Sequence, residues 1–404
     1  MSGCGSDILK ALMPESEVTD DYLLETPEQQ AANAVTHMIL ERKRPLIGEI
    51  EITLFENCPI VCDFCFHDKD STVGMTYPEM LAKLPLVEAH CKKMQGKVHA
   101  MQFNMVGGEL FQDRARETLY PMYYDLMLEI KKICDKYGHV IQVVWVSNFL
   151  FKYHEDVRKL LDDLNAVDIP SKLIASYDLS GRPTGGQYTK NIERFKDYVS
   201  TINLVATTDS INALFAGDEY FDYLYENFDL FFDDFIPDPG YDHLVPPDSL
   251  YLEFMKYIAD NYPLVFPYRE LLTQDKNQMH CMSLNKLTIF PDNTTANCRW
   301  HRYTRNDFNH AYIRKDNTNL MQAYMDEVGC LSCQYFDRCG FRCYTQWDWK
   351  NRARDLPPGV CPIREFFNYV GDTGQTSSLP HNTIERRAPF PSEMKDQEVQ
   401  PDRV

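Results

Sequence analysis

An alternation of strand-like and helix-like runs is the feature that most constrains the fold of this 404-residue chain. From Gly48 onward, six short strand-like runs are each followed by a helical pattern. Regular βα units imply a parallel sheet with right-handed crossovers, and they place functional residues at the carboxyl ends of the strands. We therefore predict an α/β fold, a partial (β/α)6 TIM-type barrel over residues 46–245, with strands near 49–55, 100–106, 140–147, 172–177, 203–208 and 228–236.

Local signals mark several helix ends within this pattern. Thr76 and Glu79 have the spacing of a capping box, which predicts the start of the first helix, and Pro85 predicts a kink in it. Gly138 is expected to end the helix whose apolar face consists of Met122, Leu126, Ile130 and Ile133.

Three closely spaced cysteines follow the first predicted strand. Cys58, Cys62 and Cys65 form a C-x3-C-x2-C motif, with Phe64 directly before the third cysteine. Three thiolates can hold three irons of a cubane cluster and leave the fourth iron open to a small chelating ligand. The alternative is a structural zinc site, for which His67 is available as a fourth ligand.

The C-x3-C-x2-C motif resembles the signature of the radical S-adenosylmethionine (SAM) enzymes. The resemblance implies a SAM-binding 4Fe-4S cluster whose open iron is chelated by the amino and carboxyl groups of SAM. It also implies reductive cleavage of SAM to methionine and a 5′-deoxyadenosyl radical, which abstracts hydrogen from a substrate.

Polar residues end the next three predicted strands. Gly107 and Gly108 let the backbone pass close to a ligand, and the Glu109 carboxylate can bind an ammonium group. This segment resembles the family's GGE motif, which implies that it holds the SAM amino group. The ends of the third and fourth predicted strands resemble those that contact the SAM carboxylate and ribose in the family, and the candidate residues there are Asn148, Ser176 and Asp178. Each of these residues also fits an ordinary polar turn or helix cap.

A second set of cysteines lies in the last third of the chain. Cys281 and Cys298 flank a hairpin-like stretch, residues 287–293, and they precede Cys330-x2-Cys333-x5-Cys339-x3-Cys343 and a final Cys361. This spacing resembles the SPASM domain, which implies a small cysteine-rich SPASM/twitch domain over residues 279–370 with two auxiliary 4Fe-4S clusters. A zinc-ribbon-like module is the alternative.

The resemblance also implies which cysteines hold which auxiliary cluster. By position, the first cluster takes Cys281, Cys298 and Cys343, and the second takes Cys330, Cys333, Cys339 and Cys361. Residues 282–297 contain no cysteine, so the first cluster has an open iron or a ligand such as His280 or Asp292.

The segment after Cys298 departs from the sulfatase-maturing members of the family. Those members place an aspartate base where this chain has Arg299. Residues 299–305 interleave basic and aromatic side chains, which can pair with phosphates and stack on bases. Arg299 and Arg302 are therefore candidate substrate contacts, although Arg299 can equally clamp a substrate carboxylate and such turns are often only solvated surface.

Composition limits the partners and the compartment. With 41 Lys and Arg against 60 Asp and Glu, the net charge is −19, which disfavours non-specific nucleic-acid binding. No apolar run is long enough to span a bilayer, and residues 1–30 lack a signal-peptide core, so we expect a cytoplasmic protein with no membrane partner, in the host cytoplasm if viral. Most of the 13 cysteines fall in tight clusters, which in a reducing compartment indicates metal binding rather than disulfides.

The remaining segments carry no recognisable chemistry. We expect an N-terminal helical extension over residues 1–45, a linker and helix over 246–278, and a disordered tail over 371–404. Cys91 and Cys134 lie on apolar faces of predicted helices and are expected to be small buried hydrophobic residues.

Together these features predict a radical SAM enzyme of the isomerase or oxidoreductase type, served by an electron donor such as flavodoxin or ferredoxin. The preferred substrate is an amino-acid-decorated thymine or other nucleobase, as in the radical SAM isomerases of bacteriophage thymidine hypermodification. The alternative substrate is a ribosomally made peptide that is oxidised or cross-linked. A non-catalytic iron-sulfur electron carrier would leave the GGE motif unexplained.

Overall fold

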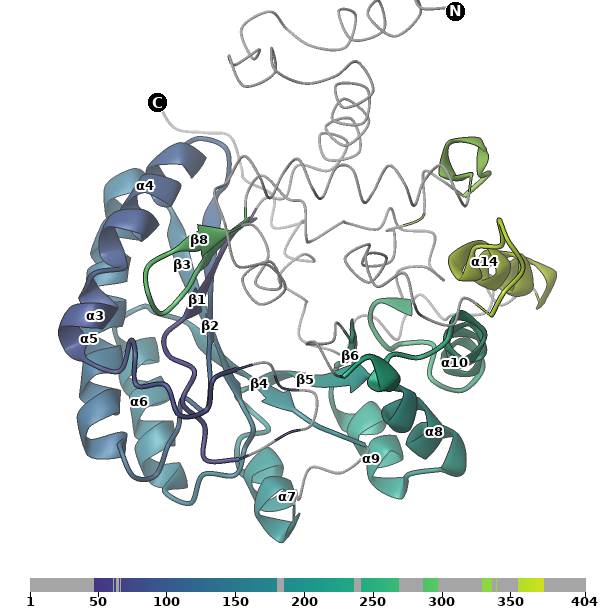
Figure 1. Ribbon diagram of the computed structural model, residues 1–404. Helices are drawn as coiled ribbons and strands as arrows, with labels where there is room; N and C mark the ends of the chain where they lie inside the picture. The colour runs from purple at the N-terminus through teal and green to yellow at the C-terminus, as the bar shows by residue number, and fades with distance from the viewer. Residues whose placement is uncertain are drawn as a thin grey trace, which may run out of the picture.

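The computed structural model describes the predicted barrel and parts of the region that follows it (Figure 1). The described residues are 47–60, 62, 65, 67–179, 185–235, 241–268, 286–296, 329–335, 339 and 355–373. The predictions for residues 1–45 and for the tail after residue 373 therefore lie outside them.

One eight-stranded sheet, in the order β6-β5-β4-β3-β2-β1-β7-β8, organises the structure. Its first six strands pair in parallel, each with its neighbour in the sequence. They are β1 (Ile47–Thr53), β2 (Ala100–Val106), β3 (Val140–Ser147), β4 (Ser171–Ser176), β5 (Val199–Ala206) and β6 (Leu230–Asp234). This arrangement confirms the predicted α/β fold with a partial TIM-type barrel, although β5 begins four residues before the predicted position.

Helices cover the outer side of the curved sheet (Figure 1). The elements outside the sheet are α3 (Tyr77–Leu81), α4 (Leu84–Met94), α5 (Arg116–Tyr137), α6 (His154–Ala166), α7 (Gly185–Arg194), α8 (Thr208–Ala216), α9 (Glu219–Asn227), η3 (Asp242–Leu244), α10 (Asp248–Asn261), η5 (Cys330–Ser332) and α14 (Pro362–Thr373).

The predicted helix signals have clear structural outcomes. The Glu79 carboxylate accepts hydrogen bonds from the backbone N–H (3.0 Å) and the hydroxyl (2.6 Å) of Thr76. Pro85 does not kink one helix as predicted; instead the chain forms two helices, α3 and α4, with the proline in the first turn of α4, where its missing N–H costs little. Gly138 caps α5 with a left-handed φ of 75°.

Each strand separates an apolar outer face from a more polar inner face. Ile50 and Ile52 of β1 are fully buried in the hydrophobic core, and Trp145 of β3 packs on Tyr123 of α5 with ring centroids 5.4 Å apart. Because successive side chains alternate across a strand, Glu49, Glu51 and Thr53 lie on the inner face. The inner face therefore carries polar groups where the outer face forms the core.

The hairpin predicted for residues 287–293 forms and joins the barrel sheet. β7 (Lys286–Ile289) pairs in parallel with β1, and β8 (Thr295–Ala296) returns antiparallel to β7. Lys83, which is fully buried, donates from Nζ to the carbonyls of Phe290 and Pro291 (both 3.0 Å) and to Asn293 Oδ1 (3.2 Å). A side chain between α3 and α4 thus holds the hairpin turn.

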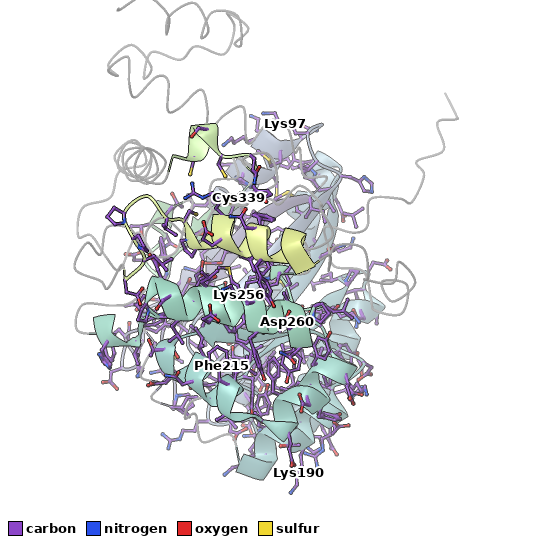
Figure 2. The ribbon with its side chains drawn as sticks, turned by 90° about the vertical axis from the view of Figure 1, so that its right-hand side faces the viewer. Lys97, Lys190, Phe215, Lys256, Asp260 and Cys339 are labelled. Atoms are coloured by element: carbon purple, nitrogen blue, oxygen red, sulfur yellow. The ribbon has the colours of Figure 1, made fainter. Side chains whose placement is uncertain are left out.

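The last described helix, α14, packs beside α10 (Figure 2). Asp260 of α10 accepts a hydrogen bond from the Tyr369 hydroxyl (2.7 Å), and the Lys256 ammonium lies over the Tyr369 ring at 5.5 Å. Cys91 and Cys134 are buried between α4 and α5, as predicted. Among the helices described, none is both long and apolar enough to cross a membrane.

Candidate cluster and cofactor site

The three cysteines of the C-x3-C-x2-C motif lie in the loop that leaves the carboxyl end of β1. Cys58, Cys62 and Cys65 are all partly buried. The Cys58 N–H donates to the Lys69 carbonyl (3.3 Å), and the Cys65 N–H donates to the Cys62 carbonyl (3.1 Å). The loop is therefore folded back on itself, and it brings three thiols to the end of the sheet where parallel α/β folds place their active residues.

The electrostatics of this loop favour a cationic occupant. Burial is the largest cause that raises the pKa of the Cys58 thiol, to about 11, and the charges of Glu109, Cys65 and Cys62 raise it further. A hydrogen bond from the Ile60 backbone acts in the opposite direction. Thiolates are the ligands of iron-sulfur clusters, and iron would supply the positive charge that offsets this mutual repulsion.

The donor set of this loop, three partly buried thiols, has the chemistry of an iron-sulfur ligand set. A cubane binds each cysteine through a different iron, so its ligands need not converge on one point. The residues present therefore fit a cluster held by Cys58, Cys62 and Cys65.

The two glycines of the GGE segment allow it to lie against the residues that precede Cys58. A Cβ added to Gly107 would lie 2.2 Å from the Phe55 carbonyl oxygen, and one added to Gly108 would lie 1.9 Å from that of Asn57. The Gly108 N–H donates to Phe55 O (2.8 Å), and the Glu109 N–H donates to Asn57 O (3.1 Å). Only glycine fits this approach, which places the GGE segment directly beside the cysteine loop.

Glu109 is buried and bridges the ends of β2 and β3. Its Oε1 accepts from the Ser147 hydroxyl (2.8 Å) and from the Phe111 N–H (2.9 Å), and its Oε2 accepts from the Asn148 N–H (2.8 Å). The carboxylate thus orients the loop after β3 toward the cysteine loop. Charge-assisted hydrogen bonds of this kind are strong, so this bridge is a rigid part of the site.

The loop after β3 adopts a tight conformation. The Asn148 side chain accepts from the Leu150 N–H (2.8 Å), and Phe149 has a φ of 60°, which is rare for a large side chain. Asn191 of α7 donates to the carbonyls of Phe149 (2.9 Å) and Phe151 (2.7 Å) and holds this conformation. Strained backbone that is held by neighbouring elements is typical of ligand sites.

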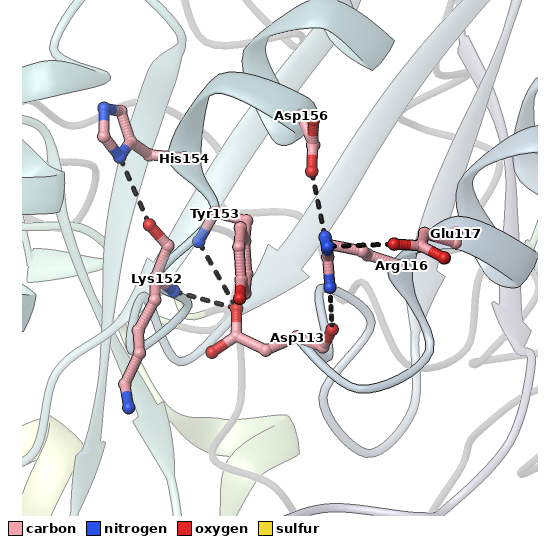
Figure 3. Close-up of polar contacts among 7 residues, drawn as sticks. All are labelled: Asp113, Arg116, Glu117, Lys152, Tyr153, His154 and Asp156. Carbon is pink, nitrogen blue, oxygen red and sulfur yellow. Dashed lines mark hydrogen bonds and ion pairs between the residues drawn. The ribbon is translucent and has the colours of Figure 1, made fainter.

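A polar cluster connects the loops after β2 and β3 on the solvent side (Figure 3). Asp113 accepts from the backbone N–H groups of Lys152 (2.9 Å) and Tyr153 (3.4 Å). The Arg116 guanidinium lies 3.7 Å from the centroid of the Tyr153 ring and donates to Asp156 (3.1 Å). These contacts fix the two loops to each other from outside, as Glu109 does from inside.

The predicted residues at the end of β4 reach the same edge of the sheet. Ser176 and Asp178 flank Tyr177, whose hydroxyl donates to Asp218 (3.3 Å) and whose backbone N–H donates to the Asn203 carbonyl (2.8 Å). Tyr177 is largely buried, while Ser176 and Asp178 are partly exposed. The structure therefore places Asn148, Ser176 and Asp178 at the carboxyl ends of neighbouring strands.

The second set of cysteines is described only in part. Cys330 opens η5, Cys361 directly precedes α14, and both are largely buried and join the main hydrophobic core, against which Cys339 packs. Tyr335 stacks on Phe367 of α14 with ring centroids 4.8 Å apart. The predicted residues Phe64, Cys281, Cys298, Cys343, Arg299 and Arg302 lie outside the described residues.

Sequence patterns did not identify every residue that shapes the site. Ser147 belongs to the polar end of the third predicted strand, but its contact with Glu109 was not predicted, and Asn191, which holds the loop after β3, occurs in an ordinary helix pattern. The inner-face residues Glu49 and Glu51 were visible only as polar positions in an alternating run. A carboxylate inside a predicted barrel strand is the signal that could have marked them.

Comparisons with known proteins identify the fold. No protein-family model matches the chain, and no curated protein matches it significantly. Among solved structures, native anSMEcpe with bound AdoMet is similar, with a TM-score of 0.53, 15% identity, and coverage of 81% of this chain and 97% of that chain. Two further anSMEcpe structures, one with AdoMet and the Cp18Cys peptide and one with AdoMet and the Kp18Cys peptide, each match with a TM-score of 0.54 and 14% identity over 82% of this chain. The match covers 99% of the chain with the Cp18Cys peptide and 100% of the chain with the Kp18Cys peptide. The chain therefore has the overall fold of these anSMEcpe structures.

Proposed function

We propose that this chain is a radical SAM enzyme, in which Cys58, Cys62 and Cys65 hold a 4Fe-4S cluster. The observation that carries the proposal is the contact between the cysteine loop and the GGE segment at the carboxyl end of the barrel. The similar anSMEcpe structures, which contain AdoMet, support it. When bound, the cluster would supply the electron that cleaves SAM reductively to a 5′-deoxyadenosyl radical.

The chain's own residues would bind and orient SAM. Glu109 lies beside Asn57, the residue before Cys58, and its carboxylate offers a negative charge to the SAM ammonium group. Asn148, Ser176 and Asp178 lie at successive strand ends, where they can contact the carboxylate and the ribose. The folded loop after β3 and the Asp113 cluster would hold these groups in place before SAM binds.

For the substrate we propose an amino-acid-decorated thymine or nucleobase, which the enzyme isomerises or modifies. The basic and aromatic residues 299–305 motivate this choice, because they can pair with phosphates and stack on bases. A ribosomally made peptide is the second candidate, and the peptides bound in two of the similar anSMEcpe structures favour it.

The cysteine motif provides the direct test of the enzyme class. Replacement of Cys58, Cys62 and Cys65 by Ala should remove the cluster ligands and abolish formation of 5′-deoxyadenosine by the anaerobically reconstituted protein. A matched Cys91→Ala variant, which removes a buried thiol far from the motif in sequence, should retain it. Persistent SAM cleavage in the triple variant would refute the assignment.

The substrate class is tested with the same product. DNA, nucleotide and peptide fractions from the native source are added to the wild-type protein, with and without nuclease or protease pretreatment. Stimulation of 5′-deoxyadenosine formation by a nuclease-sensitive fraction is expected for the nucleobase substrate. If protease pretreatment abolishes the stimulation and nuclease pretreatment does not, the nucleobase substrate is excluded and the peptide substrate is supported.

A further inference from the structure

Three polar atoms on the inner face of the neighbouring strands β2, β1 and β7 are buried without a hydrogen-bond partner. They are Glu51 Oε1 on β1, Thr288 Oγ1 on β7 and Gln102 Oε1 on β2. Glu51 and Thr288 are register partners in adjacent parallel strands, and β2 flanks β1 on the other side. Glu51 is 6% exposed and Thr288 is 0% exposed. These three residues, here called the inner-face patch, share one side of three neighbouring strands.

Two of the three patch atoms, the carboxylate oxygen of Glu51 and the amide oxygen of Gln102, can only accept hydrogen bonds, whereas the Thr288 hydroxyl can accept or donate. The Glu49 carboxylate can only accept, so Asn104 donates to it through Nδ2 (2.7 Å). The Asn104 Oδ1 is then left to accept from Gln102 Nε2 (2.8 Å). Because Gln102 donates through Nε2, its Oε1 is the amide atom that is left without a partner. A ligand of the patch therefore needs hydrogen-bond donors for Glu51 and Gln102.

Two carboxylates and one ammonium group lie together beside the patch. The Lys286 ammonium lies 3.1 Å from Glu49 Oε1 and 3.6 Å from Glu51 Oε2, so one cation is shared between two carboxylates. A buried polar atom without a partner is destabilising, so a ligand that satisfies these three atoms would bind favourably.

We propose that the inner-face patch binds an ammonium or guanidinium group of the substrate. Such groups carry several N–H donors and a positive charge, which suit the unpartnered oxygens of the patch and the Glu51 carboxylate. A phosphate would be repelled here, so the patch selects the amino or guanidino end of the substrate. This inference rests on the proposed function, and it adds which substrate group the barrel recognises.

The position along the strand is consistent with this role. Glu51 lies two residues before the last residue of β1, which is about 7 Å below the strand end at the usual rise of a strand. The cysteine loop and the GGE segment begin just above that end. A substrate anchored by its cationic group at the patch would therefore extend toward the carboxyl edge, where its reacting carbon belongs.

Calorimetric titration of the reconstituted full-length protein tests the patch directly. The probes are agmatine and n-butylamine, with butyramide as a neutral analogue of similar size. We expect both cations to bind, butyramide to bind at least about tenfold more weakly, and Glu51→Gln to weaken cation binding by about tenfold or more. Glu117→Gln, which removes an exposed carboxylate (84% side-chain exposure), is the matched control and should bind like the wild type.

Thr288→Val provides a second variant that keeps the shape of the side chain. It removes a buried hydroxyl that lacks a partner, so it should raise the melting temperature of the ligand-free protein and weaken amine binding by about fivefold. A purely structural threonine would show the opposite change in stability and no change in binding.

The outcomes separate this inference from the proposed function. Equal binding of n-butylamine and butyramide, or unchanged amine affinity in Glu51→Gln and Thr288→Val, would refute cation binding by the inner-face patch, even if the wild type cleaves SAM. Absence of 5′-deoxyadenosine from a fully reconstituted wild type would overturn the enzyme class, whatever the amine titration shows.

Discussion

Glu109→Gln is the most informative single substitution at the site, because the carboxylate joins two loops and its charge raises the pKa of the Cys58 thiol. It accepts hydrogen bonds from Phe111, Ser147 and Asn148. A glutamine that keeps its carbonyl toward Ser147 and Phe111 must turn its NH2 group toward the Asn148 N–H. One charge-assisted hydrogen bond is then lost, and two donors face each other inside the protein.

The magnitude follows from that geometry. Loss of a hydrogen bond to a charged group and of the partner of a buried N–H costs about 2–4 kcal/mol together. The substitution also removes one of the charges that raise the pKa of the Cys58 thiol to about 11, so that pKa should fall. A larger fraction of Cys58 is then in the thiolate form at pH 9, so Cys58 becomes more reactive.

Two assays measure these effects. Urea unfolding of the cluster-free protein should show the loss of stability, and the iodoacetamide rate of Cys58, measured against pH in a Cys62→Ser and Cys65→Ser background, should rise at pH 9. The affinity for SAM of the reconstituted protein should fall as well. Glu253→Gln, which removes an exposed carboxylate of α10, is the control. Unfolding free energies within about 0.5 kcal/mol and superimposable pH profiles would refute the bridging role of Glu109.

Two further substitutions test how the site is supported. Gly108→Ala should lower the iron content after reconstitution and destabilise the fold by about 3 kcal/mol or more, because its Cβ would lie 1.9 Å from Asn57 O. Gly186→Ala, whose Cβ would have no atom within 4 Å, should leave the iron content unchanged and leave the stability unchanged or slightly higher. Equal iron content in the two variants would contradict the close approach of Gly108 to Asn57. Lys83→Met should lower the free energy of unfolding in urea by about 3 kcal/mol, because it leaves the hairpin carbonyls without a donor. Lys97→Met on the surface should not lower it. Equal free energies of unfolding for the two variants would refute the role of Lys83 in holding the hairpin turn.

The sequence predicted the barrel well because its signals are local. Strand alternation, the Thr76 capping box and Gly138 each depend on residues within one element, and the structure confirms them. Pro85 was predicted to kink one helix, but the chain forms two helices there, α3 and α4. The sequence shows where a backbone N–H is missing, but it does not show whether tertiary contacts hold the helical turns on either side together.

The contacts within the site were less predictable, because they join residues that are distant in the sequence. The GGE segment was recognised, yet nothing in its letters shows that Glu109 is held by Ser147 or that Lys83 holds residues 290–293. Likewise, Glu51 and Thr288 look unremarkable until the register of β1 and β7 makes them neighbours. The pairing of strands, rather than any motif, creates the inner-face patch.

The pairing of β7 with β1 also has a consequence for how the protein folds. Strands β1 to β6 pair in the order in which they leave the ribosome, but one edge of β1 stays open until the hairpin at residues 286–296 is made. Open edges invite pairing with other chains, and inward-pointing charges are a known safeguard against it. Glu49 and Glu51 carry such charges on β1. The same two carboxylates that await Lys286 would therefore protect the nascent barrel from aggregation before the sheet is closed.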